Sequence, residues 1–235
     1  MANDLAMQDA NPVIQQNISY YDKIAMQYDE ILDRDDANRI TREKVKAAFC
    51  ELVPPGPVLD FGGGTGKDLP WLTGNGYRVI FCEPSVNMRQ KAIGLNCNHV
   101  TILGSNASDF NTWQHELPFP DKVDAILANF AVINSIPNLE TLFSNLSLVV
   151  KPGGHLLMLV LKNTFKKRWR FDKMATILSP FTGSTVTTNV RFNHHLQKVY
   201  LYTTHRINKA AQPYFHSHDH LLQENGFVLL HFTRK

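Results

Sequence analysis

The stretch Val58-Leu59-Asp60-Phe61-Gly62-Gly63-Gly64-Thr65-Gly66 decides the fold of this chain. It begins as a short apolar run and ends in alternating glycines, a pattern typical of a buried strand that turns tightly into a helix. Gly62, Gly64 and Gly66 let the backbone turn and let a ligand approach where a Cβ atom would clash. Asp60 ends the strand, where its carboxylate can fix the turn or engage a cationic group of a ligand. The stretch therefore predicts a ligand site at the end of a strand.

A second acidic residue supports this site. Glu83 follows the apolar run Tyr77 to Cys82 and lies about twenty residues beyond the glycines. A carboxylate at the end of the second strand can accept hydrogen bonds from both ribose hydroxyls of an adenosine. The pair of motifs predicts a site for a nucleoside cofactor.

Two other glycine-rich sites fail on spacing. A dinucleotide fingerprint that starts at Gly62 needs a glycine at position 67, where the chain has Lys67. A phosphate-binding P-loop needs glycine at 61 and Ser or Thr at 68, where the chain has Phe61 and Asp68. A pyrophosphate is therefore a poorer fit than an adenosine.

Strand and helix patterns alternate through the middle of the chain. Apolar runs typical of strands occupy Val58 to Phe61, Tyr77 to Cys82, Val100 to Leu103, Val123 to Ala128 and His155 to Leu161. Helical patterns lie between most of them, around Leu69 to Leu72, Ser85 to Ile93 and Leu139 to Val150. This order predicts an α/β fold with a doubly wound, mostly parallel sheet, whose ligands sit at the carboxyl ends of the strands.

One domain, 1–235, is the simplest division, because no linker-like stretch interrupts the chain. Residues 1–13 are expected to be flexible, 14–52 to form N-terminal helices, and 57–161 to form the cofactor-binding core. Residues 163–195 are basic, aromatic and turn-rich, and we interpret them as an insertion after the fifth strand that caps the substrate site. The C-terminal part, 196–235, is expected to hold a strand from Gln197 to Arg206, a helix from Ser217 to Asn225 and a strand from Phe227 to Phe232.

Composition excludes several classes of protein. The formal net charge of +3 is small for a nucleic-acid binder, so DNA is not expected as a partner. The three cysteines, Cys50, Cys82 and Cys97, form no CxxC pair, which argues against a disulfide framework or a zinc cluster. The start of the chain is polar and acidic, and the sequence has no run of about eighteen apolar residues. We expect a cytoplasmic protein that is not integral to a membrane.

These motifs resemble those of the class I S-adenosylmethionine-dependent methyltransferases, over roughly Ile18 to Gly154. The first motif of that family is an acidic residue followed by alternating glycines, as at Asp60 to Gly66. The second matches Glu83 with Pro84 beside it. The resemblance implies a Rossmann-like, seven-stranded type of sheet, S-adenosyl-L-methionine as cofactor, and Glu83 as the ribose ligand.

Further site residues follow from the same resemblance. The third motif falls on Asn106-Ala107, near the adenine, with an amide where the family usually has an aspartate. Asn129-Phe130 matches the position beside the methionine moiety. The segment from Tyr20 to Asp29 resembles the N-terminal helix that lies over the cofactor, and Tyr28 is the candidate contact there.

A general base is not identified. Many small-molecule members of the family carry a histidine pair after the fourth strand, but Asn134 and Ser135 stand there. His194 and His195 are the remaining candidates, because an imidazole can accept a proton near neutral pH. The histidines at 216, 218 and 220 would not point the same way on the predicted helix, so no metal site is expected.

Three functions remain open from the sequence. The first is a methyltransferase that acts on a small-molecule acceptor by in-line displacement. The second is a methyltransferase that acts on a protein or RNA. The third is a protein that binds the adenosyl cofactor without turnover. The presence of both Asp60 and Glu83 favours an enzyme.

Overall fold

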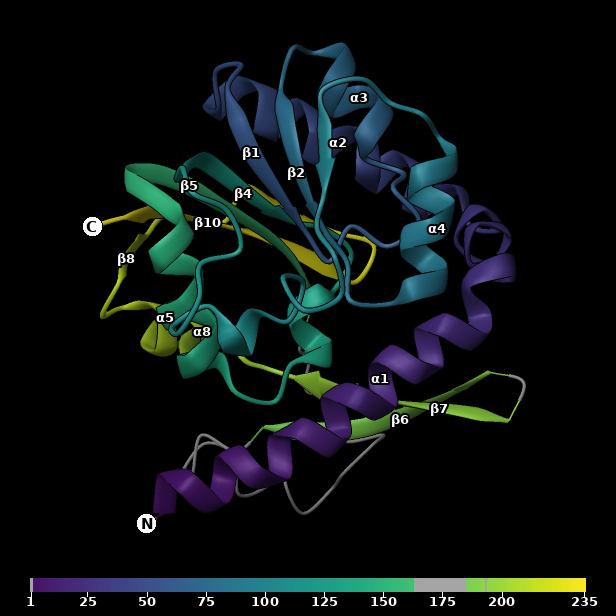
Figure 1. Ribbon diagram of the computed structural model, residues 1–235, viewed down its shortest axis with the longest axis vertical. Coiled ribbons are helices and arrows are strands. Elements are labelled where there is room, and N and C mark those ends of the chain that lie inside the picture. Colours follow the sequence, from purple (N-terminus) through teal and green to yellow (C-terminus); the bar gives the residue numbers. More distant parts are fainter. Residues whose placement is uncertain (1, 163–184, 193) are drawn as a thin grey trace.

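A twisted sheet with parallel middle strands organises the chain, as the sequence predicted (Figure 1). The structure is a computed structural model that describes residues 2–162, 185–192 and 194–235. The strand order is β3-β2-β1-β4-β5-β10-β8, and β9 also pairs with β10. The parallel strands are β1 (Pro57–Phe61), β2 (Arg78–Cys82), β3 (Val100–Ile102), β4 (Val123–Ala128) and β5 (Val150–Leu161). The antiparallel strands are β8 (Phe215–Ser217), β9 (Leu222–Glu224) and β10 (Phe227–Arg234).

Helices cover both faces of the sheet, which confirms the doubly wound arrangement (Figure 1). The helices are α1 (Ala2–Asp33), α2 (Asp36–Leu52), α3 (Leu69–Gly74), α4 (Val86–Gly94), α5 (Leu139–Val149), α8 (Thr204–Ala211) and the short 3-10 turns η1 (Phe110–Thr112) and η2 (Val132–Ser135). Several begin at side-chain caps that the sequence supplies, because Asp35, Ser85 and Asn138 accept hydrogen bonds from the first-turn N–H groups.

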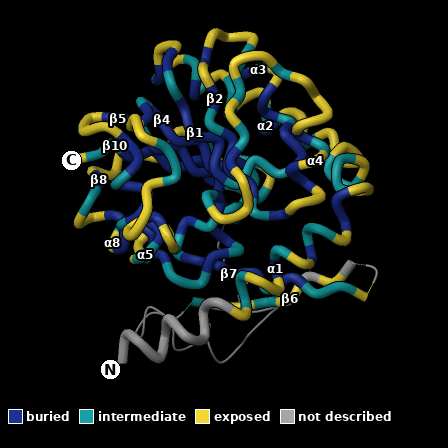
Figure 2. The backbone as a smooth tube through the Cα atoms, viewed as in Figure 1, coloured by how far each residue is buried: buried dark blue, intermediate teal, exposed yellow. Residues whose placement is uncertain are grey.

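The core forms on the two faces because successive strand residues point in opposite directions. In β1, Val58 packs into the apolar cluster that includes residues of α2 and α3, while Leu59 and Phe61 pack into the cluster that includes α5 and α8. Figure 2 shows the middle strands buried and the surrounding loops exposed. Burial on both faces explains why β1 reads as a continuous apolar run.

The predictions for the C-terminal part were wrong in two places. The strand expected from Gln197 to Arg206 ends at Leu201, and Thr203 then caps α8 by accepting a hydrogen bond from the Arg206 N–H. The helix expected from Ser217 to Asn225 is absent, and β8 and β9 occupy this stretch instead. Both short strands take hydrogen bonds from the open edge of β10, a long-range pairing that overrides the local helical pattern.

A separate two-stranded sheet lies beside α1. It consists of β6 (Val186–Phe192) and β7 (His195–Leu201), so β7 lies outside the main sheet, in which β8 is the last strand beside β10. Figure 1 shows α1 passing next to this hairpin. Of the insertion expected at 163–195, residues 163–184 and 193 lie outside the described residues.

The first helix is longer than the sequence suggested. It begins at Ala2, within the residues 1–13 that were expected to be flexible, and continues to Asp33 with Pro12 inside it. Despite its length, neither α1 nor any other helix of the described residues is long and apolar enough to cross a membrane.

Three histidine rings stack at the end of the sheet formed by β5, β8 and β10. His155 Nδ1 lies 3.0 Å from His231 Nε2, and the His218 ring stacks on His231 at 4.5 Å between centroids. The His218 ring also lies 2.9 Å from the Thr233 hydroxyl. Burial, reinforced by His218 and His155, lowers the pKa of His231 to about 4. His231 is therefore neutral in the folded protein at neutral pH.

This arrangement predicts an acid-sensitive sheet edge. The pKa of His231 is about 4 in the folded protein, against a usual value of about 6.5. The neutral imidazole therefore stabilises the folded protein above pH 6.5, and this stabilisation is lost as the pH falls toward 4. His231→Phe keeps a ring but removes the titration. We expect the fall in melting temperature between pH 7.5 and pH 5.5 to be smaller in this variant than in the wild type.

His205→Gln is the control, because His205 is exposed. It should follow the wild-type pH dependence. If the melting temperature falls equally with pH in the wild type and in His231→Phe, the histidine stack does not cause the acid sensitivity.

Candidate active site

The turn after β1 is left-handed at alternate residues. Gly62, Gly64 and Gly66 have φ values of 70°, 59° and 82°, a region that other residues adopt only with strain. The Gly62 N–H donates to the carbonyl of Cys82 at 2.7 Å, which fixes the turn against the end of β2. A Cβ atom at Gly62 would lie 2.5 Å from Val132. The alternating glycines of the motif are thus required by the backbone itself.

A cavity of about 480 Å³ lies above this turn. Its walls come from the carboxyl ends of β1, β2 and β4, from α1 and α2, and from the segment around η1 and η2. The predicted site residues among its walls are Tyr28, Gly62, Gly64, Glu83, Pro84, Asn106, Asn129 and Phe130. Other residues that line it were not predicted from the sequence, among them Asp22, Arg42, Thr65, Asp68, Ser105, Asp109, Phe110, Val132, Ser135 and Ile136.

Glu83 connects β2 to the glycine turn. Its carboxylate accepts hydrogen bonds from the N–H groups of Gly64 at 2.9 Å and Ser85 at 2.8 Å. Burial raises the pKa of Glu83 to about 7, against the opposing effect of these two hydrogen bonds. The side chain is therefore held in the cavity wall at a fixed place, and its charge changes near neutral pH.

Asp60 lies beneath the turn. Both oxygens of its carboxylate are buried and have no hydrogen-bond partner among the described residues. Burial, then the negative charge of Asp68, raises the pKa of Asp60 well above its usual range, although Arg42 opposes this. A buried carboxyl group without donors is costly in its charged form, so the raised pKa favours the neutral form of Asp60.

Asp68 gathers three donors from different elements. Arg42 Nη1 donates to one oxygen at 2.5 Å and Trp71 Nε1 to the same oxygen at 2.8 Å, while Asn129 Nδ2 donates to the other at 2.9 Å. The Arg42 guanidinium also lies over the Phe130 ring, 4.5 Å from its centroid. In the sequence, Asp68 serves only to exclude a P-loop. No local spacing predicts that Asp68 contacts Arg42.

Strain marks the end of β4. Phe130 and Ala131 are consecutive non-glycine residues in the left-handed region, with φ values of 50° and 65°. Asn129 supports this turn, since its Oδ1 accepts a hydrogen bond from the Phe130 N–H at 3.0 Å. Such strain concentrates at functional sites. Here it places the Phe130 ring under Arg42.

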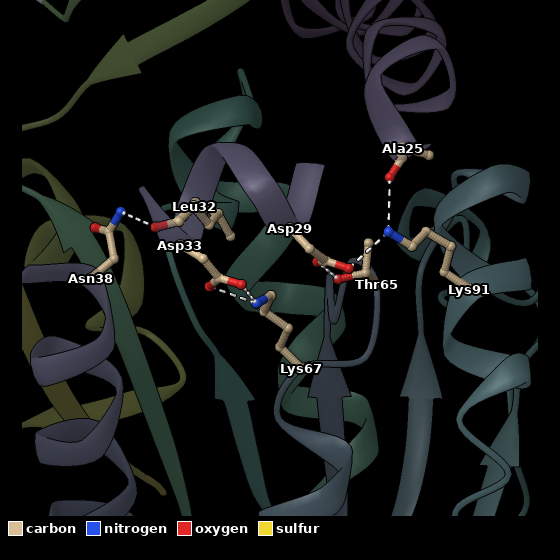
Figure 3. A network of polar contacts seen from close by, with 8 residues as sticks. All are labelled: Ala25, Asp29, Leu32, Asp33, Asn38, Thr65, Lys67 and Lys91. Carbon is tan, nitrogen blue, oxygen red and sulfur yellow. Dashed lines mark hydrogen bonds and ion pairs between the residues drawn. The ribbon is translucent and has the colours of Figure 1, made fainter. Parts of the chain in front are cut away.

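Polar contacts hold α1 over the turn (Figure 3). Asp29 accepts a hydrogen bond from the Thr65 hydroxyl at 2.5 Å and pairs with Lys91 of α4 at 2.8 Å. One turn of α1 farther on, Asp33 pairs with Lys67 at 2.6 Å. Burial alone would raise the pKa of Asp29, but Lys91 and Thr65 outweigh it and lower that pKa. Asp29 and Asp33 thus tie α1 to the glycine turn, to the residue that follows it and to α4.

A second network joins α1 to η2 and β7. Gln197 Nε2 donates to the Tyr21 hydroxyl at 2.7 Å and to the Ser135 hydroxyl at 2.9 Å. Asn17 Nδ2 donates to the Ser135 carbonyl at 3.0 Å. Asn134 points elsewhere, because its amide bonds the Tyr200 carbonyl. Of the two positions matched to the family's histidine pair, only Ser135 lines the cavity.

Three predicted site residues, Asp60, Gly66 and Ala107, lie outside the cavity wall. Gly66 serves packing, because a Cβ there would lie 2.9 Å from that of Ala92. Ala107 lies behind the wall, and its carbonyl accepts a hydrogen bond from Trp113 Nε1. Its contact with an adenine stays a prediction.

The structure does not bring the two candidate bases, His194 and His195, to the main cavity. His194 and His195 line a separate, smaller cavity with Tyr20 and Lys23, because the hairpin of β6 and β7 carries them to the outer side of α1. Among the described residues, no group of three or more His, Cys, Asp or Glu side chains could hold a metal ion.

Comparison with known proteins identifies the family of this chain. Residues 32–231 match the methyltransferase domain family. The chain therefore belongs to that family, and it is a class I S-adenosylmethionine-dependent methyltransferase with a Rossmann-like sheet. The resemblance drawn from the glycine turn and Glu83 is confirmed.

Solved structures share the fold at low identity. A complex of DhpI with S-adenosylhomocysteine is 17% identical, with a TM-score of 0.68, and the match covers 94% of this chain and 97% of that one. The 1,6-didemethyltoxoflavin-N1-methyltransferase of Burkholderia thailandensis is 14% identical, with a TM-score of 0.63 and coverage of 93% and 88%. The N-methyltransferase NodS of Bradyrhizobium japonicum is 12% identical, with a TM-score of 0.59 and coverage of 86% and 90%. No curated protein sequence matches the chain.

The position of Glu83 predicts its effect on cofactor binding. Glu83→Ala should weaken the affinity for S-adenosylhomocysteine by about 1 to 3 kcal/mol, because hydrogen bonds to a charged group are lost. In the wild type the affinity should rise from pH 6 to pH 8, since the pKa of about 7 leaves the carboxylate partly protonated at the lower pH. Titration calorimetry at both pH values measures the two effects.

Glu116→Ala is the matched control, because Glu116 is an exposed carboxylate outside the cavity. It should leave affinity and pH dependence unchanged. An unaltered affinity in Glu83→Ala would contradict the assignment of the ribose site.

The clamp on α1 generates a kinetic prediction. Asp29→Asn removes the ion pair with Lys91, so α1 should separate from the glycine turn more often. We expect the dissociation rate of S-adenosylhomocysteine to rise about two- to fivefold, in line with the modest strength of partly exposed ion pairs. Stopped-flow displacement measures this rate.

Glu30→Gln provides the comparison on the same helix, since within the described part of the chain Glu30 pairs with Arg34 alone, at the exposed surface. If both variants release the ligand at the wild-type rate, α1 does not control ligand exit through Asp29.

Proposed function

We propose that the enzyme transfers a methyl group to a small-molecule acceptor bound in the main cavity, beneath α1 and η2. The observation that carries this proposal is the cavity itself. Its volume of about 480 Å³ lies within the usual range of small-ligand sites, and its walls mix apolar and polar side chains. The clamps at Asp29 and at Tyr21 close α1 over it, which disfavours entry of a protein or RNA segment.

The residues at the turn fit the cofactor. The turn leaves room for a ligand at Gly64, because among the described residues a Cβ atom there would meet only Tyr28, at 3.8 Å. Glu83 faces the same cavity and can accept from ribose hydroxyls. When bound, S-adenosylmethionine supplies an electrophilic methyl group on a sulfonium. The chain's part is to align the acceptor atom with that methyl and to exclude water.

The structural neighbours support a small acceptor. Among them are a glycopeptide N-methyltransferase and an enzyme whose structure contains 1,6-didemethyltoxoflavin. No histidine lines the cavity among the described residues, so we infer that an acceptor proton leaves to solvent or through a group such as the Tyr21 or Ser135 hydroxyl. The free cysteines Cys50, Cys82 and Cys97 suit a reducing compartment, and we propose the cytoplasm.

Acceptor-dependent turnover tests the proposal. The enzyme is incubated with S-adenosylmethionine labelled in its methyl group and with separate small-molecule, protein and RNA fractions of a cell extract. We expect label to enter the small-molecule fraction and S-adenosylhomocysteine to appear in equal amount. Glu83→Ala should reduce both signals together.

Other distributions of label favour the alternatives. Label confined to protein or RNA would replace the small-molecule acceptor with a macromolecule. Binding of the cofactor without transfer to any fraction would favour a protein that holds the cofactor without turnover.

A further inference from the structure

A second cavity, here called the outer cavity, lies where the hairpin of β6 and β7 meets the outer side of α1 (Figure 1). Its volume is about 240 Å³. Tyr20 and Lys23 line it from the helix, and His194 and His195 line it from the hairpin. None of these four residues lines the main cavity, so the proposed methyl transfer does not use them.

One side of α1 forms the inner wall of the outer cavity. Gln16 and Tyr20 are four residues apart, and so are Ser19 and Lys23. Side chains at this spacing lie on the same side of a helix, and all four residues line the outer cavity. This side of α1 therefore presents an amide, two hydroxyl groups and an ammonium group to the hairpin.

Hydrogen bonds between α1 and β7 fix the two walls of the outer cavity. Gln16 Nε2 donates to the Leu196 carbonyl at 3.4 Å. Asn17 exchanges two hydrogen bonds with the backbone of Lys198, since its Nδ2 donates at 3.0 Å and its Oδ1 accepts at 2.9 Å. His195 begins β7, so its position follows from the same contacts. Walls that are already held together lose little freedom when a ligand binds between them.

The side chains of the outer cavity favour an anion. Lys23 is exposed and makes no ion pair within the described part of the chain. Each imidazole of His194 and His195 has at least one N–H donor, and neither ring is hydrogen-bonded to a described residue. Among the described residues, no Asp or Glu lines this cavity. Donors and positive charge without a competing carboxylate are the chemistry that binds anions.

Tyr20 adds a buried donor to the same space. The residue is only 6% exposed, and its side chain packs with Ile24 and Met88. Burial raises the pKa of Tyr20, so its phenol stays protonated at neutral pH. Its hydroxyl makes no hydrogen bond with the described residues. A buried hydroxyl without a partner is costly, and an anion in the outer cavity can accept its hydrogen bond.

We propose that the outer cavity binds the phosphoryl group of a small phosphate compound between Lys23 and Tyr20 of α1 and the two histidines of the hairpin. A phosphoryl group has three acceptor oxygens that point in different directions, so it can accept from both walls at once. A carboxylate has two oxygens in one plane and suits a single wall better. The volume lies below the usual range for drug-sized ligands, which also suits a compact anion.

The melting temperature at increasing phosphate concentration tests the site. The protein is first saturated with S-adenosylhomocysteine, so that phosphate does not enter the main cavity. Sodium phosphate is then compared with sodium acetate and sodium chloride at pH 7.5 and equal ionic strength. We expect phosphate to raise the melting temperature above the value in chloride and acetate to leave it there, because a ligand that binds the folded state stabilises it. The concentration dependence gives an apparent dissociation constant for phosphate.

Variants locate the bound phosphate. Lys23→Gln and His195→Gln should each raise the apparent dissociation constant about three- to tenfold, because a charge-assisted hydrogen bond is lost. Tyr20→Phe keeps the packed ring and removes only the hydroxyl, so it should raise the constant about two- to fivefold. Lys122→Gln and His205→Gln are the matched controls, since both residues are exposed and outside the two cavities. They should bind phosphate as the wild type does.

The melting temperature of each variant in chloride is its baseline, so a loss of stability is not counted as a loss of binding. The proposal is wrong if phosphate has no more effect than chloride, or if acetate stabilises the protein equally. It is also wrong if the wild-type response to phosphate persists in Lys23→Gln, His195→Gln and Tyr20→Phe, because phosphate then binds elsewhere. Each of these results leaves methyl transfer to a small acceptor standing, since that is measured by label.

Discussion

Between Phe61 and Gly66 the backbone is left-handed at every second residue, and the N–H groups of this turn are tied to β2. Cys82 accepts from Gly62, and the Glu83 carboxylate accepts from Gly64. This link between two parallel strands holds the base of the cavity and places a carboxylate in its wall. A side chain at Gly62 would collide with Val132, so the turn also sets how closely η2 can approach. The base of the cavity and the position of Glu83 depend on these few contacts of the turn.

Carboxyl groups gather around the same turn. Asp60, Asp68 and Glu83 all lie within the buried end of the sheet, and Arg42 is ion-paired with Asp68. The burial of carboxyl groups costs free energy unless donors compensate it. Asp68 is fully compensated by three side chains, Glu83 by two backbone N–H groups, and Asp60 by no described residue. Asp68 and Glu83 are thus fixed by their donors, whereas Asp60 has a raised pKa that favours its neutral form.

The roof of the cavity is attached differently from its floor. The floor belongs to the apolar cores on the two faces of the sheet, whereas α1 has a small apolar cluster with Met88. Polar contacts of Asn17, Tyr21, Asp22, Asp29 and Asp33 also hold α1. Polar contacts near the surface exchange with water more readily than buried apolar ones. A roof of this kind can separate from the turn to admit the cofactor while the sheet stays intact.

The sequence by itself determined the parallel part of the sheet, the glycine turn and the place of Glu83, because strand periodicity and backbone conformation are local properties. It failed where partners are distant in the chain. The edge of β10 drew residues 215–217 and 222–224 into strands, and the hairpin carried His194 and His195 away from the cavity. Arg42 meets Asp68 and Phe130 only after α2 packs beside the sheet. Tertiary structure decided these contacts, because no spacing within one segment encodes which side chains from separate elements will meet.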